Sequence, residues 1–327
     1  MQTLVTGSSG HLGEALVRTL RGQGKPVLGL DRKPGPFTSA LGSITDRAFV
    51  RRCLADATTV FHAATLHKPH VATHPREDFV ATNVTGTLVL LEEARRAGVG
   101  AFIFTSTTST FGDALQPPAG APAAWITEDV TPVAKNIYGV TKTAAEDLCQ
   151  EFHRNEQLAC LVLRTSRFFP EQDDNPSARD EFADENLKLN EYLHRRVELE
   201  DVVGAHLCAA QAATSLGFGR YIISATTPFA PSDCAALRHD AAAIVRRYVP
   251  EYEAEYAKRG WKMAASLDRV YVNERARRDL RWEPKHDFRS LISRLRSGAT
   301  TRSELARLVG SKGYHAETFA EGPYPVG

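Results

Sequence analysis

The chain has 327 residues, of which 43% are hydrophobic and 24% are charged, and its 40 basic and 39 acidic residues leave a net charge of +1. This composition excludes a disordered or fibrous chain, and the balanced charge excludes the basic surface expected of a nucleic-acid-binding protein. At about 150 residues per domain the length predicts two domains.

Short apolar runs and longer amphipathic stretches alternate along the first 165 residues. The predicted strands are Thr3–Thr6, Val27–Asp31, Val60–Ala63, Phe102–Ser106 and Leu161–Arg164. The predicted helices lie between them, near Leu12–Arg21, Arg47–Ala55, Pro75–Ala97 and Ile137–Arg154. This alternation predicts βαβ units, and therefore an α/β fold with a Rossmann-type, doubly wound parallel sheet covered by helices on both faces.

The pattern changes after Arg164, where a polar, acidic stretch precedes mainly helical segments. Helices are predicted near Phe182–Tyr192, Asp201–Ala213, Cys234–Tyr248, Asn273–Leu280 and Phe288–Arg296, and one strand at Tyr221–Ser224. We expect residues 1–165 to form one domain and residues 166–327 a smaller, mainly helical region, some of whose elements return to the sheet. The final segment, residues 310–327, is rich in Gly, Pro and aromatic residues and predicts an extended arm.

A glycine-rich loop, Thr6-Gly7-Ser8-Ser9-Gly10-His11-Leu12-Gly13, follows the first strand and opens the first helix. In a dinucleotide-binding loop Gly7 makes the tight turn, Gly10 lets a pyrophosphate approach the backbone, and Gly13 lets the helix pack closely on the strand. The alternative is an ordinary glycine-rich turn. The position of the loop between a strand and a helix favours dinucleotide binding.

The end of the second strand indicates which dinucleotide binds. Asp31 lies 18 residues beyond Gly13. A carboxylate there can hydrogen-bond the adenosine ribose and repels a 2′-phosphate, so the sequence predicts NAD rather than NADP. Arg32 is the counter-argument, since an arginine beside that site could accept the phosphate. The first domain is therefore predicted to bind NAD and the second region to bind the substrate.

Tyr138 and Lys142 have the YxxxK spacing, which places both side chains on one face of a helix. Free tyrosine, with a pKa of about 10, is a poor base. An ammonium about 4 Å away contributes on the order of 4 kcal/mol at an effective dielectric near 20, which would lower the tyrosine pKa by roughly three units. Such a tyrosinate could take a proton from an alcohol while hydride leaves its carbon. The preceding strand ends in hydroxyl residues, of which Thr107 is predicted to hold the substrate oxygen; a simple turn is the alternative.

These residues together resemble the extended short-chain dehydrogenase/reductase family, also called the NAD-dependent epimerase/dehydratase family. Three further segments are similar to family motifs: Phe61-His62-Ala63-Ala64, Asn83-Val84-Thr85-Gly86-Thr87, and Phe102–Thr107 followed by Phe111-Gly112. The resemblance implies that Thr107, Tyr138 and Lys142 are catalytic. The coenzyme contacts that it implies are Gly7, Ser9, Gly10, His11, Leu12, Gly13, Asp31, Arg32, Ala63, Ala64, Asn83, Thr105, Tyr138 and Lys142.

The substrate segment departs from the nucleotide-sugar enzymes of the family. In residues 164–170, Arg164 is not followed by the proline and the asparagine that those enzymes have shortly after this arginine. The stretch that follows also lacks their diphosphate-anchoring pattern. The segment looks more like the uronate dehydrogenase branch, which oxidises free sugar acids and would place Ser166 or Arg167 at the substrate. Arg167 could clamp a carboxylate, or it could form a structural salt bridge with Glu171 or Asp173. His67 and Thr108 are the other predicted substrate contacts.

Two further signals leave alternatives open. His67, His70 and His74 lie on one proline-flanked loop, and their spacing fits no strict ligand set. We therefore predict no metal site at these histidines. Two alternatives remain for them, a substrate contact and a solvated loop. Asn83 could brace the active-site helix or a water chain, with packing inside its own helix as the alternative.

The predicted function is hydride transfer between NAD and a hydroxyl or keto carbon of a small sugar-like substrate. One alternative is an NAD-dependent sugar or nucleotide-sugar epimerase or dehydratase with tightly bound NAD; another is a non-catalytic dinucleotide sensor. Five scattered cysteines, no apparent secretory signal and no apolar run of about 18 residues predict a cytoplasmic protein without a membrane partner. The resemblance suggests a homodimer formed through the helices that carry Asn83 and Tyr138.

Overall fold

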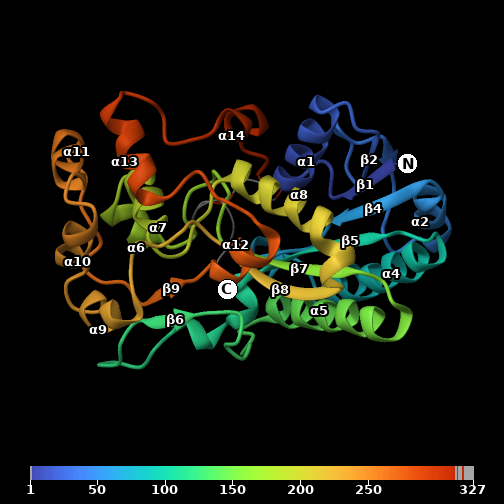
Figure 1. Ribbon diagram of the computed structural model, residues 1–327, viewed down its shortest axis with the longest axis horizontal. Coiled ribbons are helices and arrows are strands. Elements are labelled where there is room, and N and C mark those ends of the chain that lie inside the picture. The colour runs from blue at the N-terminus through green and yellow to red at the C-terminus, as the bar shows by residue number, and fades with distance from the viewer. Residues whose placement is uncertain (1, 314, 316–318, 320–327) are drawn as a thin grey trace.

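A parallel sheet of seven strands forms the centre of the structure (Figure 1). The structure is a computed structural model that describes residues 2–313, 315 and 319. The strand order is β3-β2-β1-β4-β5-β7-β8. The strands are β1 Gln2–Thr6, β2 Val27–Asp31, β3 Ala40–Leu41, β4 Ala57–His62, β5 Ala101–Thr107, β7 Cys160–Thr165 and β8 Phe218–Ile223. The predicted α/β fold with a doubly wound parallel sheet is confirmed.

Helices cover both faces of this sheet because successive strand residues point to opposite sides. In β5, Phe102 and Phe104 belong to one apolar core, whereas Ile103 belongs to the other. The first core is formed with α2 Arg47–Leu54, α4 Gly86–Arg96 and α5 Ile137–Glu156. The second is formed with α1 His11–Gly22, α8 Leu199–Leu216, α12 Glu274–Leu280 and α14 Glu304–Val309. Figure 1 shows α5 and α8 on opposite sides of the strands.

The strand order reverses between β1 and β4, where β1 has β2 on one side and β4 on the other. All paired strands of the sheet are parallel, so their carboxyl ends lie at one edge. A crevice at such a reversal is the usual ligand site of an open α/β sheet. The fold therefore directs attention to the loops that follow β1, β4, β5 and β7.

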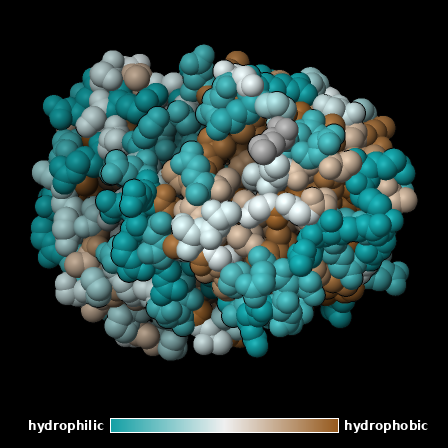
Figure 2. All heavy atoms as spheres, turned by 45° about the vertical axis from the view of Figure 1, so that its right-hand side comes forward, coloured by the Kyte–Doolittle hydropathy of each residue, from teal (hydrophilic) through white to brown (hydrophobic). Residues whose placement is uncertain are grey.

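A second, mainly helical region lies beside the sheet, at the left of Figure 1. Its helices are α6 Pro176–Glu181, α7 Asp184–Glu191, α9 Cys234–Leu237, α10 Ala241–Tyr248, α11 Tyr252–Arg259 and α13 Phe288–Arg296. A small parallel pair, β6 Ala124–Ile126 and β9 Arg269–Tyr271, joins it to a segment from the first half of the chain. Figure 2 shows a surface on which hydrophilic side chains predominate, with hydrophobic atoms in recesses between them.

Several elements differ from the sequence predictions. The helix predicted at Pro75–Ala97 is divided into α3 Arg76–Phe79, a π-helical segment η2 Val80–Thr85, and α4. The helix predicted at Cys234–Tyr248 is broken before α10, because Asp240 caps that helix by accepting a hydrogen bond from the amide of Ala243 (3.0 Å). Helices α6, α11 and α14 were not predicted. The remaining short elements are η1 Lys68–His70, η3 Thr108–Phe111, η4 Asp113–Leu115 and η5 Pro231–Asp233.

The predicted arm at residues 310–327 is described only at residues 310–313, 315 and 319, and the rest of it lies outside the described residues. Within the part of the chain that the structure describes, we find no helix with the length and apolar character needed to cross a membrane.

Candidate active site

A cavity of about 720 Å³ lies at the carboxyl edge of the sheet, where the strand order reverses. It is lined by the loop after β1, the end of β2, the loop after β4, the end of β5 and the segment after β7. The predicted coenzyme residues among its lining are Gly7, Ser9, Gly10, His11, Leu12, Gly13, Asp31, Arg32, Ala63, Ala64, Thr105 and Tyr138. These residues come from five separate segments of the sequence, the fifth being α5 with Tyr138, and they meet at one site.

The glycines after β1 form a cradle that side chains would fill. Gly7 has a φ of +75°, and a Cβ atom there would lie 2.8 Å from the backbone nitrogen of Ala64. A Cβ atom on Gly13 would lie 1.9 Å from the carbonyl oxygen of Gly7. Gly10 precedes the first residue of α1, so the helix N-terminus faces this loop and favours an anion there. These features fit the pyrophosphate of a dinucleotide.

Asp31 lies at the far end of the same cradle. One carboxylate oxygen accepts a hydrogen bond from the amide of Ser9 (3.0 Å) and the other accepts one from the amide of Lys33 (2.9 Å). Both Asp31 and Arg32 line the cavity. The carboxylate is thus fixed between the phosphate loop and the next turn, in the position that suits a ribose hydroxyl.

A buried chain of hydrogen bonds fixes the end of β4 next to the glycine loop. The amide of Ala64 donates to the Thr6 hydroxyl (3.2 Å), and that hydroxyl contacts Nδ1 of His62 (2.8 Å). On its other side His62 contacts the Thr87 hydroxyl (3.0 Å) through Nε2. Burial holds the pKa of His62 well below its ordinary value, so the ring is neutral and acts as a structural link between β1, β4 and α4.

Asn83 lies behind the cavity, within the π-helical segment η2. Its side-chain oxygen accepts hydrogen bonds from the Leu66 amide and the Thr65 hydroxyl, both at 2.9 Å. Its amide nitrogen donates to the Leu66 carbonyl (2.9 Å) and to Thr141 on α5 (3.1 Å). The side chain therefore ties the loop after β4 to the helix that carries Tyr138. Its direct contact with the coenzyme stays a prediction.

Tyr138 lines the cavity, and Thr107 lies close to it. Thr107 ends β5, and Tyr138 is the second residue of α5, whose start is fixed by Asn136 as it accepts a hydrogen bond from the Gly139 amide (3.2 Å). The Thr107 hydroxyl accepts a hydrogen bond from the Ser109 amide (3.0 Å). Burial raises the pKa of Tyr138 to about 12, although the nearby Thr107 hydroxyl opposes this rise. Thr108 begins the buried turn that follows β5.

Lys142 lies one helical turn after Tyr138 and is almost fully buried. Its Nζ donates to the carbonyl oxygen of Thr105 (2.6 Å) and lies 3.9 Å from the centre of the Phe104 ring. Burial lowers the pKa of Lys142 to about 7, although the nearby carboxylate of Glu146 opposes this change. The expectation that Lys142 lowers the pKa of Tyr138 is therefore wrong for this structure, because burial dominates both groups and the ammonium is directed at a carbonyl.

A buried ionic group supports α5, the helix that carries Tyr138 and Lys142, and the sequence analysis did not identify it. Glu146 accepts hydrogen bonds from the Ser106 hydroxyl (2.6 Å) and from Arg164 (2.7 Å for the shorter ion pair). Arg220 also donates to this carboxylate (3.1 Å). An available signal was the position of Glu146 four residues after Lys142, which places a carboxylate on the buried face of α5.

Thr105 is held by a second neutral histidine. The Nδ1 atom of His206 must donate to the Val202 carbonyl (2.8 Å), so its Nε2 atom accepts from the Thr105 hydroxyl (2.9 Å). Burial lowers the pKa of His206 to about 4. The hydroxyl of Thr105 is thus oriented by α8, while its carbonyl receives Lys142.

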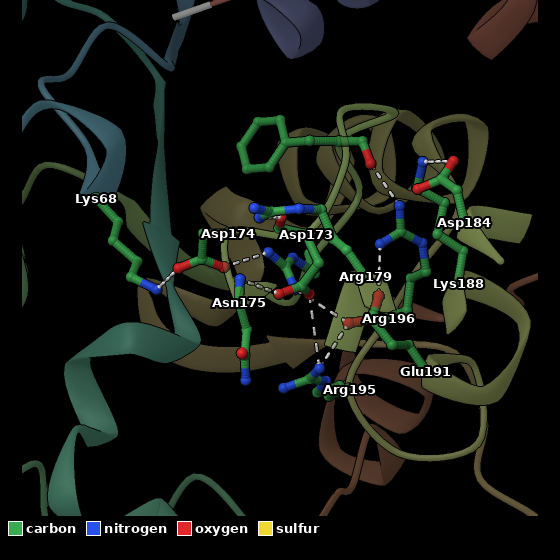
Figure 3. Close-up of polar contacts among 12 residues, drawn as sticks. Lys68, Asp173, Asp174, Asn175, Arg179, Asp184, Lys188, Glu191, Arg195 and Arg196 are labelled. Carbon is green, nitrogen blue, oxygen red and sulfur yellow. Dashed lines mark hydrogen bonds and ion pairs between the residues drawn. The ribbon is translucent and has the colours of Figure 1, made fainter. Parts of the chain in front are cut away.

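Arg167, a predicted substrate residue, belongs to a dense ionic network whose other members are labelled in Figure 3. It pairs with Asp173, with Asp174 (3.0 Å) and with Glu191 (3.1 Å). Figure 3 shows Lys68 approaching Asp174 from one side, and Arg195 and Arg196 approaching Glu191 from the other. The salt bridge with Asp173 that the sequence left open is present, together with the pairs to Asp174 and Glu191.

Ser166, His67 and Thr108 are the other three residues predicted to face a substrate, and Thr108 is buried at the start of η3. Ser166 is buried, and its hydroxyl has no hydrogen-bond partner among the described residues. His67 lines the cavity and lies 5.7 Å from the ring of Phe169, centre to centre. Burial holds the pKa of His67 well below its ordinary value. Among the described residues, no group of histidine, cysteine, aspartate and glutamate side chains is arranged to hold a metal ion.

The cavity also has lining residues that the sequence analysis missed. Lys312, Gly313 and His315 complete its wall, together with Phe168 and Phe169. No local motif marks Lys312, Gly313 and His315, because they reach the cavity only through the path of the chain after α14.

Comparison with known proteins agrees with this geometry. The model of the NAD dependent epimerase/dehydratase family matches residues 3–223, more than half of the chain. A UDP-glucose 4-epimerase from Erwinia amylovora is 29% identical over 184 residues, which cover 50% of this chain and 52% of that protein. A dTDP-glucose 4,6-dehydratase from Streptomyces niveus is 33% identical over 194 residues, covering 53% and 55%. The chain thus spans about half the length of these curated relatives.

The fold has solved counterparts over nearly its whole length. One is a short-chain dehydrogenase/reductase superfamily protein from Agrobacterium tumefaciens with bound NAD, which has a TM-score of 0.64 and 21% sequence identity. The match covers 94% of this chain and 99% of that protein. At this identity the likeness concerns the fold.

Proposed function

The chain belongs to the NAD-dependent epimerase/dehydratase family and is therefore an enzyme with NAD as its coenzyme, and we propose that it is a dehydrogenase acting on a hydroxyl carbon of a small sugar-like compound. The observation that carries this proposal is the closeness of Thr107 to Tyr138, whose side chain lines the cavity, with Lys142 on the next helical turn. The other residues named as coenzyme contacts are proposed to hold NAD.

In this proposal the chain's own groups position the substrate and move one proton. The Thr107 hydroxyl orients the substrate oxygen beside the phenol of Tyr138, and Tyr138 takes the proton of the alcohol during oxidation or returns it during reduction. Bound NAD supplies the hydride acceptor, and its positive ring favours the tyrosinate. Lys142 can shift its ammonium from the Thr105 carbonyl toward a ribose hydroxyl, because both are oxygen acceptors for the same donor.

A small substrate is supported by the ionic network after β7. A nucleotide diphosphate needs cations that are not already neutralised, yet Arg167 and Arg196 are paired with Asp173, Asp174 and Glu191. The uronate dehydrogenase branch is the narrower form of the proposal. For a sugar acid, the buried hydroxyl of Ser166 is the better candidate contact, because Arg167 would have to exchange one of its carboxylate partners.

The test is the Tyr138→Phe variant, with Tyr221→Phe as its matched control. Tyr221 is also buried, and burial raises the pKa of its phenol to about 12 as well, but it lies on β8 and outside the cavity lining. Free sugars, sugar acids and nucleotide sugars are screened by NADH absorbance, together with analysis of sugar epimers. We expect Tyr138→Phe to lose turnover by about 10²- to 10⁴-fold while still binding NAD, and Tyr221→Phe to keep its turnover. Full activity of Tyr138→Phe would refute the assigned role.

An epimerase or dehydratase is the second candidate, favoured by the relatives that carry those names. Such an enzyme returns the hydride to the substrate, so the sugar changes while no NADH accumulates. The same screen therefore separates the two reactions. A non-catalytic dinucleotide sensor would give neither signal, and the intact Tyr138–Lys142 pair argues against it.

Further expectations remain proposals. We propose a homodimer formed through η2 and α5, supported by Val80 and Val140, which are about half exposed on these two elements. Light scattering of Val140→Glu tests it, and an unchanged dimer would argue against this face. A cytoplasmic location and the division at residue 165 into an NAD-binding domain and a substrate-binding region also remain proposals.

A further inference from the structure

The described residues that follow α14 include part of the wall of the coenzyme cavity. Lys312, Gly313 and His315 line the same cavity as the glycine loop after β1, about 300 positions earlier in the sequence. Figure 1 shows α14 beside α1 and α8, which brings the chain to this place. We call the described residues 310–313 and 315 the C-terminal strap. The Lys312 amide nitrogen also lies 3.2 Å from Nε2 of His11 in the glycine loop, so a coenzyme in the cavity would lie against both segments.

One carboxylate holds the middle of the strap. Oε1 of Glu171 accepts hydrogen bonds from the Ser311 hydroxyl (2.7 Å), the Lys312 amide (3.0 Å) and the Gly313 amide (3.3 Å). The same oxygen contacts Nε2 of His11 (2.8 Å), the first residue of α1. Burial alone would raise the pKa of Glu171, but the hydrogen bonds from His11 and Ser311, with the charge of His11, lower it to about 2. Glu171 is therefore an anion at every ordinary pH, which strengthens its hydrogen bonds.

Two further contacts tie the strap to both sides of the cavity. The ammonium of Lys312 donates to Oε2 of Glu14 on α1 (2.5 Å). On the opposite side, Nε2 of His315 contacts the Pro69 carbonyl (2.9 Å), and its ring lies 5.2 Å from that of His70. The strap thus contacts both α1, which follows the glycine loop, and the histidine-bearing turn at Lys68–His70.

We propose that the C-terminal strap closes over bound NAD, and that its contacts with Glu171 and Glu14 must break each time the coenzyme enters or leaves. This proposal rests on the NAD site of the proposed function but not on which reaction follows. A strap of this kind limits coenzyme exchange in a dehydrogenase and retains the coenzyme in an epimerase. Its role is therefore tested by exchange of the coenzyme and not by turnover.

The experiment uses the full chain loaded with NADH, whose fluorescence reports dissociation when excess NAD is added in a stopped-flow instrument. Lys312→Ala removes the contact with Glu14, and Glu171→Gln weakens the acceptor of the strap amides. Arg307→Ala, on the exposed side of α14, is the matched control. Association is measured by mixing NADH with the coenzyme-depleted proteins.

Each loss of a charge-assisted hydrogen bond is expected to raise both the association and the dissociation rate constants by about ten- to a hundred-fold, whereas Arg307→Ala leaves them unchanged. A strap that opens and closes speeds both steps and moves the dissociation constant much less. Unchanged exchange in Lys312→Ala and Glu171→Gln would overturn the proposal. Faster dissociation with unchanged association would also overturn it, because the strap would then be a direct coenzyme contact. Failure of turnover leaves both rates measurable, so the two proposals fail separately.

Discussion

The buried ammonium of Lys142 makes the stability of this protein depend on pH in a way that one substitution removes. Lys142→Met keeps a side chain of similar length but cannot carry a proton. The wild-type group is 2% exposed and has one hydrogen bond, to the Thr105 carbonyl. Burial lowers its pKa from the ordinary value of 10.5 to about 7 in the folded protein, whereas the unfolded chain keeps the ordinary value.

The sign and size of the effect follow from these two pKa values. Between them the unfolded chain binds more protons than the folded protein, so the free energy of unfolding of the wild type rises with pH. A single site with these pKa values gives a rise of about 2.5 kcal/mol between about pH 7.5 and about pH 9.5, at about 1.4 kcal/mol for each pKa unit. Lys142→Met lacks this contribution, while every other titrating group is common to both proteins.

The assay is urea-induced unfolding of both proteins across this pH range, without added NAD. The difference in the free energy of unfolding between wild type and Lys142→Met should change by about 2.5 kcal/mol in favour of the wild type as the pH rises. The slope carries the test, because the level of the difference also contains the lost hydrogen bond to Thr105. Parallel curves would refute the argument, since they would mean that Lys142 has an ordinary pKa when folded.

Two other predictions follow from buried groups. Burial raises the pKa of Tyr138 to about 12, so its neutral phenol predominates near neutral pH. We therefore expect kcat/KM for alcohol oxidation to rise by up to about tenfold per pH unit from about pH 7 to about pH 9. A flat profile would count against a buried phenol as the base. Glu146→Gln leaves the buried charge of Arg164 without its carboxylate and should lower the free energy of unfolding by about 3 to 5 kcal/mol. The control Glu156→Gln, which affects a half-exposed pair with Arg95, should change it by less than about 1 kcal/mol; equal effects in chemical denaturation would contradict the role of the buried network.

The sequence predicted most of the sheet and the coenzyme loop because both depend on local patterns. The alternating apolar residues of β5 belong to two different cores, as a parallel strand covered on both faces requires. The glycines at positions 7 and 13 were predicted from their spacing, and the structure shows backbone atoms where their side chains would be. The break before α10 and the π-helical segment around Asn83 were missed, because each depends on a specific contact and not on a periodic pattern.

The candidate site likewise has features that local sequence predicted and features that only the tertiary structure determined. Residue types and their spacing alone place a tyrosine and a lysine on one helix, a threonine at the end of a strand and an aspartate at the end of another. The tertiary structure decided their chemistry: it buries Lys142 and Tyr138, moves both pKa values toward the neutral forms, and occupies Arg167 with three carboxylates. It also brings Lys312 to Glu14 across almost the whole chain. Burial and contacts between distant segments depend on the packed three-dimensional arrangement, which no local stretch of sequence contains.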